Sequence, residues 1–213
     1  MNSIAIVDYG MGNLRSVSKA LEHVDSSAAI TVSSDPEVIR SASRVVVPGQ
    51  GAMPHCMQAL NEQGLRETII EAARNKPFLG ICLGLQMLFE ESEEGGIQAL
   101  GILPGKVKKL ESGNITSHHD NPKIKIPHMG WNQVHQTLKH PLWQGIEPDT
   151  RFYFVHSYYV ATDESEIIAG STDYPTPFTC AVAKDNIFAV QFHPEKSHSA
   201  GLALLSNFLK WVP

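Results

Sequence analysis

The chain has 213 residues, of which 42% are hydrophobic and 18% charged, and its formal net charge at pH 7 is −5. This composition is typical of a globular protein, and the length suits one domain, residues 1–213. The negative charge argues against a surface that binds nucleic acid or an anionic membrane. Three cysteines are too few, and odd in number, for a disulfide framework. No apolar run is long enough to span a bilayer and no basic leader is visible, so we expect a cytoplasmic protein.

The first ninety residues alternate short apolar runs with segments of helical spacing. The predicted strands are Ser3–Val7, Ile30–Val32, Arg44–Val47 and Pro77–Ile81. The predicted helices are Leu14–Val24, a short helix opening at Asp35-Pro36-Glu37 with Ser34 or Asp35 as its cap, Pro54–Asn61 and Leu65–Arg74. This alternation favours an open parallel sheet with helices on both faces. The loops at 8–13, 48–52 and 80–84 would share the carboxyl edge of that sheet, where ligands bind.

The second half of the chain has a different pattern. A helix that begins at Leu85 should end after Glu94, because Gly95-Gly96 breaks it. Strands and then a final helix follow, with a tight turn at Asp185-Asn186: Lys106–Leu110, Trp131–Thr137, Arg151–Val160, Glu166–Ser171, Thr179–Ala183, Ile187–Gln191 and the helix Ser199–Trp211. We therefore predict an α/β fold with an open, mixed but mainly parallel sheet.

Two patterns that could indicate a cofactor or a metal fail on inspection. The glycine turn after the first strand lacks the dinucleotide fingerprint, because Arg15 stands where its third glycine belongs. His118-His119-Asp120 lies in a polar stretch without ligand spacing, which favours a solvated loop. We expect neither a cofactor nor a metal.

One cysteine stands at the tip of a predicted strand–turn–helix, in Gly80-Ile81-Cys82-Leu83-Gly84. This pattern matches the elbow that presents a nucleophile, with cysteine in place of serine, and its glycines suit a turn where backbones pass closely. A buried thiol at a strand end is the plain alternative, because free cysteine packs as a small hydrophobic residue. The other two cysteines, Cys56 in a helix and Cys180 in a strand, are expected to be inert.

A candidate base follows the last strand in Phe192-His193-Pro194-Glu195. His193 and Glu195 are two residues apart, so in extended backbone both point to one side. A free thiol with a pKa near ~8.5 is mostly protonated at neutral pH, and an imidazole oriented by a carboxylate would accept its proton. A helix starting after Cys82 would favour the thiolate further. Alone, this tripeptide is more typical of a surface turn; beside a cysteine elbow, catalysis becomes the better interpretation.

Attack on an amide carbonyl builds an oxyanion, which needs two donors already in place. One would be the N–H of Leu83, which follows the nucleophile. The second would be the backbone N–H of Gln50, at another glycine-rich strand tip. An ordinary Pro-Gly turn is the alternative there. His156 is a rival base, but no carboxylate lies two residues away, which favours a core or wall position.

Three motifs occur in the order and spacing of one family: Pro48-Gly49-Gln50-Gly51, Gly80-Ile81-Cys82-Leu83-Gly84 and Phe192-His193-Pro194-Glu195-Lys196. They resemble the class I (triad) glutamine amidotransferases over nearly the whole chain. Three more segments are similar to the glutaminase subunits of imidazole glycerol phosphate synthase: Val7–Leu14, Pro127–Asn132 and Phe154–Tyr158. The resemblance implies that glutamine is hydrolysed through a thioester on Cys82. It also implies that the ammonia passes, within a heterodimer, to a cyclase subunit of (β/α)₈ barrel fold that serves histidine biosynthesis.

The same resemblance assigns further residues. Gln86, Gly51 and Ser157 would contact the substrate glutamine, although without the family Gln86 could equally be a half-exposed helix residue. The strand His128, Met129, Trp131 and Asn132 would dock the cyclase, whereas the residues alone favour a strand entry with a core tryptophan.

Two other functions stay open at this stage. One is a different cysteine–histidine hydrolase, such as a γ-glutamyl hydrolase; some of these carry histidine directly after the cysteine, where this chain has Leu83. The other is a non-catalytic regulatory subunit, against which the intact set of Cys82, His193 and Glu195 argues.

Overall fold

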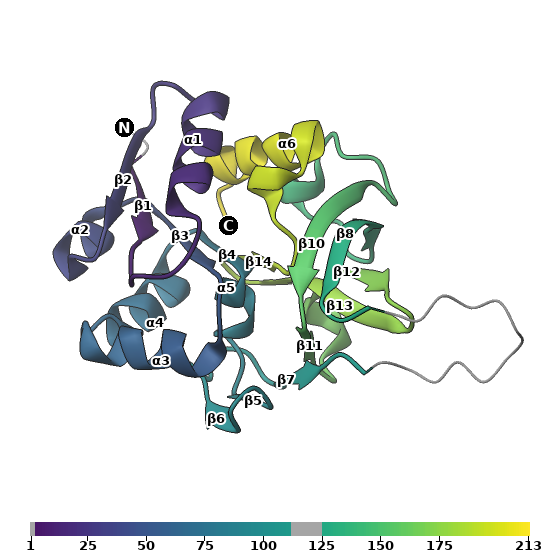
Figure 1. Ribbon diagram of the computed structural model, residues 1–213. Helices are drawn as coiled ribbons and strands as arrows, with labels where there is room; N and C mark the ends of the chain where they lie inside the picture. Colours follow the sequence, from purple (N-terminus) through teal and green to yellow (C-terminus); the bar gives the residue numbers. More distant parts are fainter. Residues whose placement is uncertain (1–2, 112–124) are drawn as a thin grey trace, which may run out of the picture.

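The computed structural model describes residues 3–111 and 125–213, so the predicted loop His118-His119-Asp120 lies outside the described residues. In the described part of the chain, twelve strands form a mixed sheet, and helices cover both of its faces (Figure 1). The main path through this sheet has the order β2-β1-β3-β4-β14-β13-β11-β7-β5-β6. The predicted fold class is confirmed.

One half of the sheet is parallel. Its strands are β1 (Ser3–Val7), β2 (Ala29–Ser33), β3 (Arg44–Gly49) and β4 (Phe78–Cys82). Alternate side chains enter two different cores: Ile4 and Ile6 pack on one face, and Ala5 and Val7 on the other. Burial on both faces explains why β1, β3 and β4 read as continuous apolar runs. The edge strand β2 is instead largely exposed.

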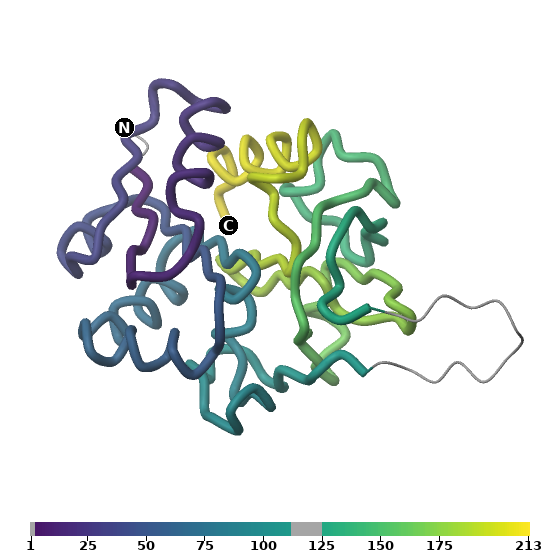
Figure 2. The backbone as a smooth tube through the Cα atoms, in the orientation of Figure 1, coloured from purple at the N-terminus to yellow at the C-terminus, as the bar shows by residue number. Residues whose placement is uncertain are grey.

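The helices divide between the two faces as the core residues do. On one side, α1 (Leu14–Val24) lies beside α6 (His198–Lys210), although their sequence positions are far apart (Figures 1 and 2). The other face carries α2 (Pro36–Ser41), α3 (Met53–Glu62) and α4 (Arg66–Asn75). Asp35 caps α2 by accepting a 2.9 Å hydrogen bond from the N–H of Glu37. The predicted cap is confirmed, and the predicted bounds of α1, α3, α4 and α6 are confirmed within one residue at each end.

The other half of the sheet is mainly antiparallel. Strand β14 (Ile187–Val190) runs parallel to β4 and antiparallel to β13 (Pro177–Lys184), and Asp185 takes a positive φ of 51° in the predicted turn. The remaining strands of this sheet are β11 (Tyr158–Ala161), β7 (Lys106–Lys109), β5 (Glu91–Ser92), β6 (Ile97–Gln98), β12 (Ile168–Asp173) and β9 (His135–Gln136). A separate antiparallel pair is formed by β8 (His128–Gln133) and β10 (Arg151–His156).

The predicted helix from Leu85 to Glu94 is wrong. Helix α5 spans only Leu83–Gln86, and β5 and β6 form a hairpin beyond it. Apolar residues 87–89 are buried, and their carbonyls accept hydrogen bonds from residues 100–103 instead of continuing the helix. The helix dipole expected beside Cys82 is correspondingly small, because it sums over only one turn.

Two predicted strands are also divided. The run Arg151–Val160 breaks at Ser157 into β10 and β11, which belong to different sheets. The run Trp131–Thr137 begins earlier, at His128, and breaks at the buried Val134 into β8 and β9. Periodicity alone does not reveal where a strand changes sheets. The described residues also include three short 3₁₀ turns: η1 (Pro141–Trp143), η2 (Ser165–Ile167) and η3 (Pro194–Lys196). Within the described ranges, the helices are too short or too polar to cross a bilayer.

Candidate active site

Cys82 ends β4 in a strained backbone conformation. Its φ of 56° and ψ of −109° lie where a residue with a side chain is rarely found. The two glycines around it are required by close packing. A Cβ on Gly84 would lie 1.9 Å from the carbonyl oxygen of Val47, and one on Gly80 would lie 2.7 Å from the oxygen of Gly84. The surrounding backbone therefore holds the cysteine at the tip of a tight elbow, as predicted from the motif.

His193 and Glu195 meet as the sequence predicts. Nδ1 of His193 lies 2.9 Å from Oε1 of Glu195, whose side chain is only 1% exposed. The turn is tied to β10, because His193 N–H donates to the oxygen of Tyr153 at 2.9 Å, and the hydroxyl of Ser197 donates to the oxygen of His193 at 2.6 Å. Gly201 lets α6 approach, since a Cβ there would lie 1.8 Å from the oxygen of Pro194. Ser197 and Gly201 have no motif signal that predicts these roles.

The electrostatics favour a charged imidazole. Burial lowers the pKa of His193, but the nearby Cys82 sulfur and Glu195 carboxylate outweigh it and raise the pKa to about 10. Nε2 of His193 is buried without a hydrogen-bond partner. The effect of the sulfur on this pKa means that the imidazole lies close to Cys82. Its Nε2 atom is available to accept or donate a proton.

The two predicted oxyanion donors are neighbours because their strands are in register. Gly49 of β3 pairs with Cys82 of β4, so the residues that follow them, Gln50 and Leu83, lie side by side at the carboxyl edge. Leu83 is the first residue of α5, and its N–H therefore has no acceptor within that helix. The buried Tyr9 hydroxyl holds this edge by donating to the oxygen of Pro48 at 2.8 Å.

A cavity of about 720 Å³ opens above these groups. It joins the three predicted loops at the sheet edge to the end of β10 and to His193. The predicted substrate contacts Gln86, Gly51 and Ser157 all line it. Within the described residues, no cluster of histidine, cysteine and carboxylate side chains has the geometry to hold a metal ion.

No motif assigns a role to Gln191, which is fully buried beside the candidate nucleophile Cys82. Val190 of β14 pairs with Ile81 of β4, so Gln191 is level with Cys82, and its Nε2 lies 3.6 Å from Sγ. The available signal was one amide at the end of the apolar run Ile187-Phe188-Ala189-Val190.

Comparison with known proteins decides the family. The sequence pattern of the family "Glutamine amidotransferase class-I" matches residues 5–211. The chain belongs to the class I glutamine amidotransferases. It is 84% identical, over the full length of both chains, to a Nitrosomonas europaea protein named "Imidazole glycerol phosphate synthase subunit HisH", and 63% identical, also over both full lengths, to the Nitrosospira multiformis protein of the same name. The solved "Structure of PurLQS from Thermotoga maritima" is similar in fold, with a TM-score of 0.72 at 17% identity over 98% of this chain and 97% of that one.

The predicted docking strand of this amidotransferase is only partly exposed. Met129 is 61% and Trp131 41% exposed, and the indole stacks on His198 with ring centroids 4.9 Å apart. Asn132 is half-buried. The side chain of His128, in contrast, is 3% exposed and stacks between Tyr174 and Phe154. The available surface is therefore carried by Met129 and Trp131 on β8.

The other two cysteines of this amidotransferase lie in the core. Burial raises the pKa of the Cys56 thiol to about 12, and it raises that of Cys180 strongly as well. Such thiols stay protonated at neutral pH and react slowly.

Proposed function

We propose that this chain is the glutaminase subunit of an imidazole glycerol phosphate synthase, with residues 1–213 forming one glutaminase domain. The observation that carries the proposal is Cys82, held on a strained elbow beside the His193–Glu195 pair in a cavity of about 720 Å³. The names of the two relatives, at 84% and 63% identity over both full lengths, support the choice of synthase.

The reaction follows from these groups. The Cys82 thiolate attacks the side-chain amide carbon of glutamine, while the N–H groups of Leu83 and Gln50 stabilise the oxyanion. His193 then gives its Nε2 proton to the leaving nitrogen, so ammonia departs and a γ-glutamyl thioester remains. Water attacks that thioester after losing a proton to His193, and glutamate leaves as the thiolate forms again. Glu195 holds the imidazole in the tautomer that leaves Nε2 facing the sulfur.

The substrate contacts are restricted by hydrogen bonds already made. Both amide hydrogens of Gln86 are used, towards the oxygen of Tyr158 at 3.0 Å and Oε1 of Gln191 at 2.9 Å. Gln86 can therefore offer only its oxygen, which suits the α-ammonium group of glutamine. Gly51 and Ser157 would complete the wall of the pocket.

The partner in this proposal is a (β/α)₈ cyclase that forms a heterodimer over β8 and receives the ammonia. It would convert a phosphorylated ribulosyl-formimino carboxamide ribotide to imidazole glycerol phosphate and aminoimidazole carboxamide ribotide. Exposed Met129 and Trp131 support this site, because methionine and tryptophan are enriched at interface cores. The free state of all three cysteines supports a cytoplasmic location.

The test is ammonia release from glutamine, measured with and without a cyclase barrel and its ribotide ligand. We expect weak release alone and a large increase with the liganded partner. Cys82→Ala should abolish release and leave partner binding intact, because it removes only the sulfur. Cys180→Ala, which removes a buried thiol outside the cavity, is the matched control. Release retained by Cys82→Ala, or equal rates with and without the partner, would overturn the proposal.

A further inference from the structure

The backbone oxygen of Tyr158 is a junction between two hydrogen-bonded branches. It receives one hydrogen bond from Nε2 of Gln86 at 3.0 Å and another from Nδ1 of His156 at 2.8 Å. A carbonyl oxygen only accepts, so both of these nitrogens must be donors. The junction therefore fixes which atom points where along each branch.

The inward branch ends at the nucleophile. Because Nε2 of Gln86 is a donor, the atom of Gln191 that lies 2.9 Å away must be its acceptor oxygen. The amide nitrogen of Gln191 then has to face Cys82, where Nε2 lies 3.6 Å from Sγ. This donor favours the thiolate, whereas the oxygen of Val155, 4.0 Å from Sγ, can only accept and favours the thiol. Both glutamine side chains are buried, so bulk water does not compete strongly for these bonds.

The outward branch reaches the predicted docking strand. His156 donates through Nδ1, so as a neutral imidazole it accepts at Nε2 from Nδ1 of His128, 2.9 Å away. His128 in turn accepts at Nε2 from the amide of Asn132 at 3.3 Å, and that amide also donates to the oxygen of Asp173 at 2.9 Å. Burial keeps both rings neutral near pH 7, because it lowers the pKa of His128 to about 4 and that of His156 to about 3.

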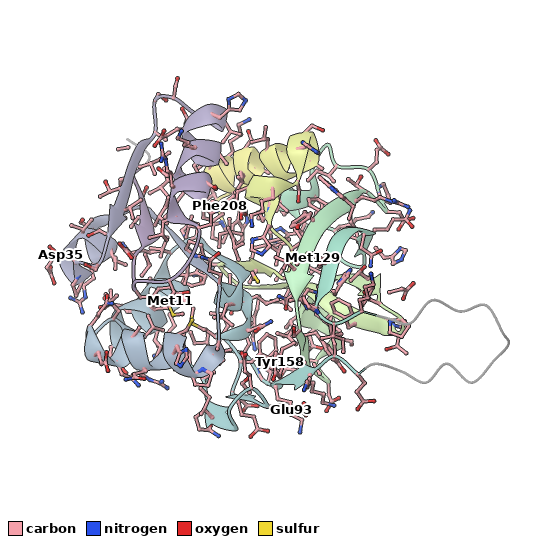
Figure 3. All side chains as sticks on the ribbon, viewed as in Figure 1. Met11, Asp35, Glu93, Met129, Tyr158 and Phe208 are labelled. Atoms are coloured by element: carbon pink, nitrogen blue, oxygen red, sulfur yellow. The ribbon has the colours of Figure 1, made fainter. Side chains whose placement is uncertain are left out.

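We infer that Gln191 is a positioning residue for the nucleophile: Gln86 and the Tyr158 carbonyl orient its amide so that an N–H points at the Cys82 sulfur, and His156 and His128 extend the same chain of hydrogen bonds to Asn132 on β8. The inference rests on the proposed function, since it assumes that this sulfur reacts. Figure 3 labels Tyr158 below Met129 in this view, and both Tyr158 and His156 line the cavity, whereas His128 belongs to β8. In this inference Gln86 has two roles. It orients the Gln191 amide that donates to the sulfur, and its own oxygen is offered to the substrate.

The inner step is tested by the rate at which iodoacetamide alkylates Cys82, followed by mass spectrometry across pH. Gln191→Glu keeps the acceptor that Gln86 needs and replaces the donor facing the sulfur with a carboxylate oxygen. We expect its rate at pH 7 to fall about tenfold and the midpoint of the pH profile to rise by about one unit. Gln144→Glu makes the same change at an exposed position and should match the native chain. If the midpoint of Gln191→Glu matches both, the inference is overturned.

A second pair of variants covers the outer branch, and also the case in which Gln191→Glu does not fold. His156→Asn can still donate to the Tyr158 oxygen from the position of Nδ1, whereas His156→Gln moves its amide to the position of Nε2 and loses that bond. We expect the asparagine variant to keep the native alkylation profile and the glutamine variant to shift it in the direction of Gln191→Glu. Equal profiles for the two variants would overturn the orientation argument.

The synthase assay separates this inference from the proposed function. With a cyclase present, Gln191→Glu should lower kcat for ammonia release about tenfold while KM for glutamine stays within about twofold, because the amide acts on the sulfur. Alkylation needs neither glutamine nor a partner. If the native chain releases no ammonia, the proposed function fails, and the alkylation profiles still decide whether Gln191 orients the sulfur.

Discussion

The parallel and antiparallel halves of the sheet contribute different kinds of group to one cavity. The proposed nucleophile Cys82 ends β4, and the proposed oxyanion donors follow β3 and β4, where Gly49 and Gly84 let main chains approach. Strand β14 and its extension contribute side chains, Gln191 and the His193–Glu195 pair. The backbone groups can take these positions because glycines leave room for neighbouring main chains. Side-chain groups are placed by hydrogen bonds, so the two halves should fail in different ways.

The largest effect is expected at the backbone side. Gly84→Ala places a Cβ only 1.9 Å from the Val47 oxygen, so α5 and β3 must separate. We expect loss of glutaminase activity, with unfolding free energy lowered by about 3 kcal/mol or more. Gly170→Ala, at a buried glycine of strand β12, meets a side-chain carbon at 3.2 Å and should lower the unfolding free energy far less. Chemical denaturation and ammonia release measure both, and equal losses would contradict the distance argument.

Removal of the base should come second. His193→Ala should slow ammonia release by about 10²–10⁴-fold with the fold retained, because no other group takes the proton. Glu195→Gln should slow it less, since it orients the imidazole without transferring the proton. Glu147→Gln, the same change on an exposed residue, serves as the control. A larger loss for Glu195→Gln than for His193→Ala would show that orientation dominates.

A smaller effect should follow from the support beneath the oxyanion edge. Tyr9→Phe removes the hydroxyl that donates to the oxygen of Pro48 at 2.8 Å in a fully buried site. A carbonyl left without its donor costs about 1–3 kcal/mol of unfolding free energy. Urea denaturation should detect this loss. The control is Tyr153→Phe: the hydroxyl of Tyr153 makes no hydrogen bond within the described structure, so its removal should leave the unfolding free energy nearly unchanged.

The effect that is smallest near neutral pH concerns His140, which lies away from the cavity. Burial against Phe188 and Trp211 lowers the pKa of His140 to about 4, while its Nδ1 accepts from the N–H of Leu142. Between pH 6.5 and pH 4, His140 is protonated in the unfolded chain but mostly neutral in the fold. The free energy of unfolding therefore falls as the pH is lowered towards 4. His140→Asn keeps an acceptor at this helix cap and does not titrate. Its unfolding free energy should depend less steeply on pH between 4 and 6.5, and unchanged slopes would show that the ring is protonated in the fold.

The two halves also differ in how well the sequence predicts them. The inner parallel strands are buried on both faces and read as apolar runs, so Ser3–Val7 and the strand reaching Cys82 could be placed closely. The long run Arg151–Val160 hid a break at Ser157, because residues in two sheets share one apolar pattern. The proposed nucleophile Cys82 and the proposed base His193 each lie in a motif that can be found in the sequence. Gln191 carries none, since its importance comes from register with a strand far away in sequence.

The pairing of Val155 with Met129 bears on how ammonia leaves. Val155 contacts the sulfur with its carbonyl, and Met129, opposite it on β8, is 61% exposed. Neighbouring strands lie about 4.8 Å apart, so the backbone that carries this carbonyl is about that far from a strand with an exposed side chain. So short a diffusion path gives this chain little means of retaining a small neutral product. Whether ammonia is kept from escaping to solvent would depend on how completely a partner covers β8.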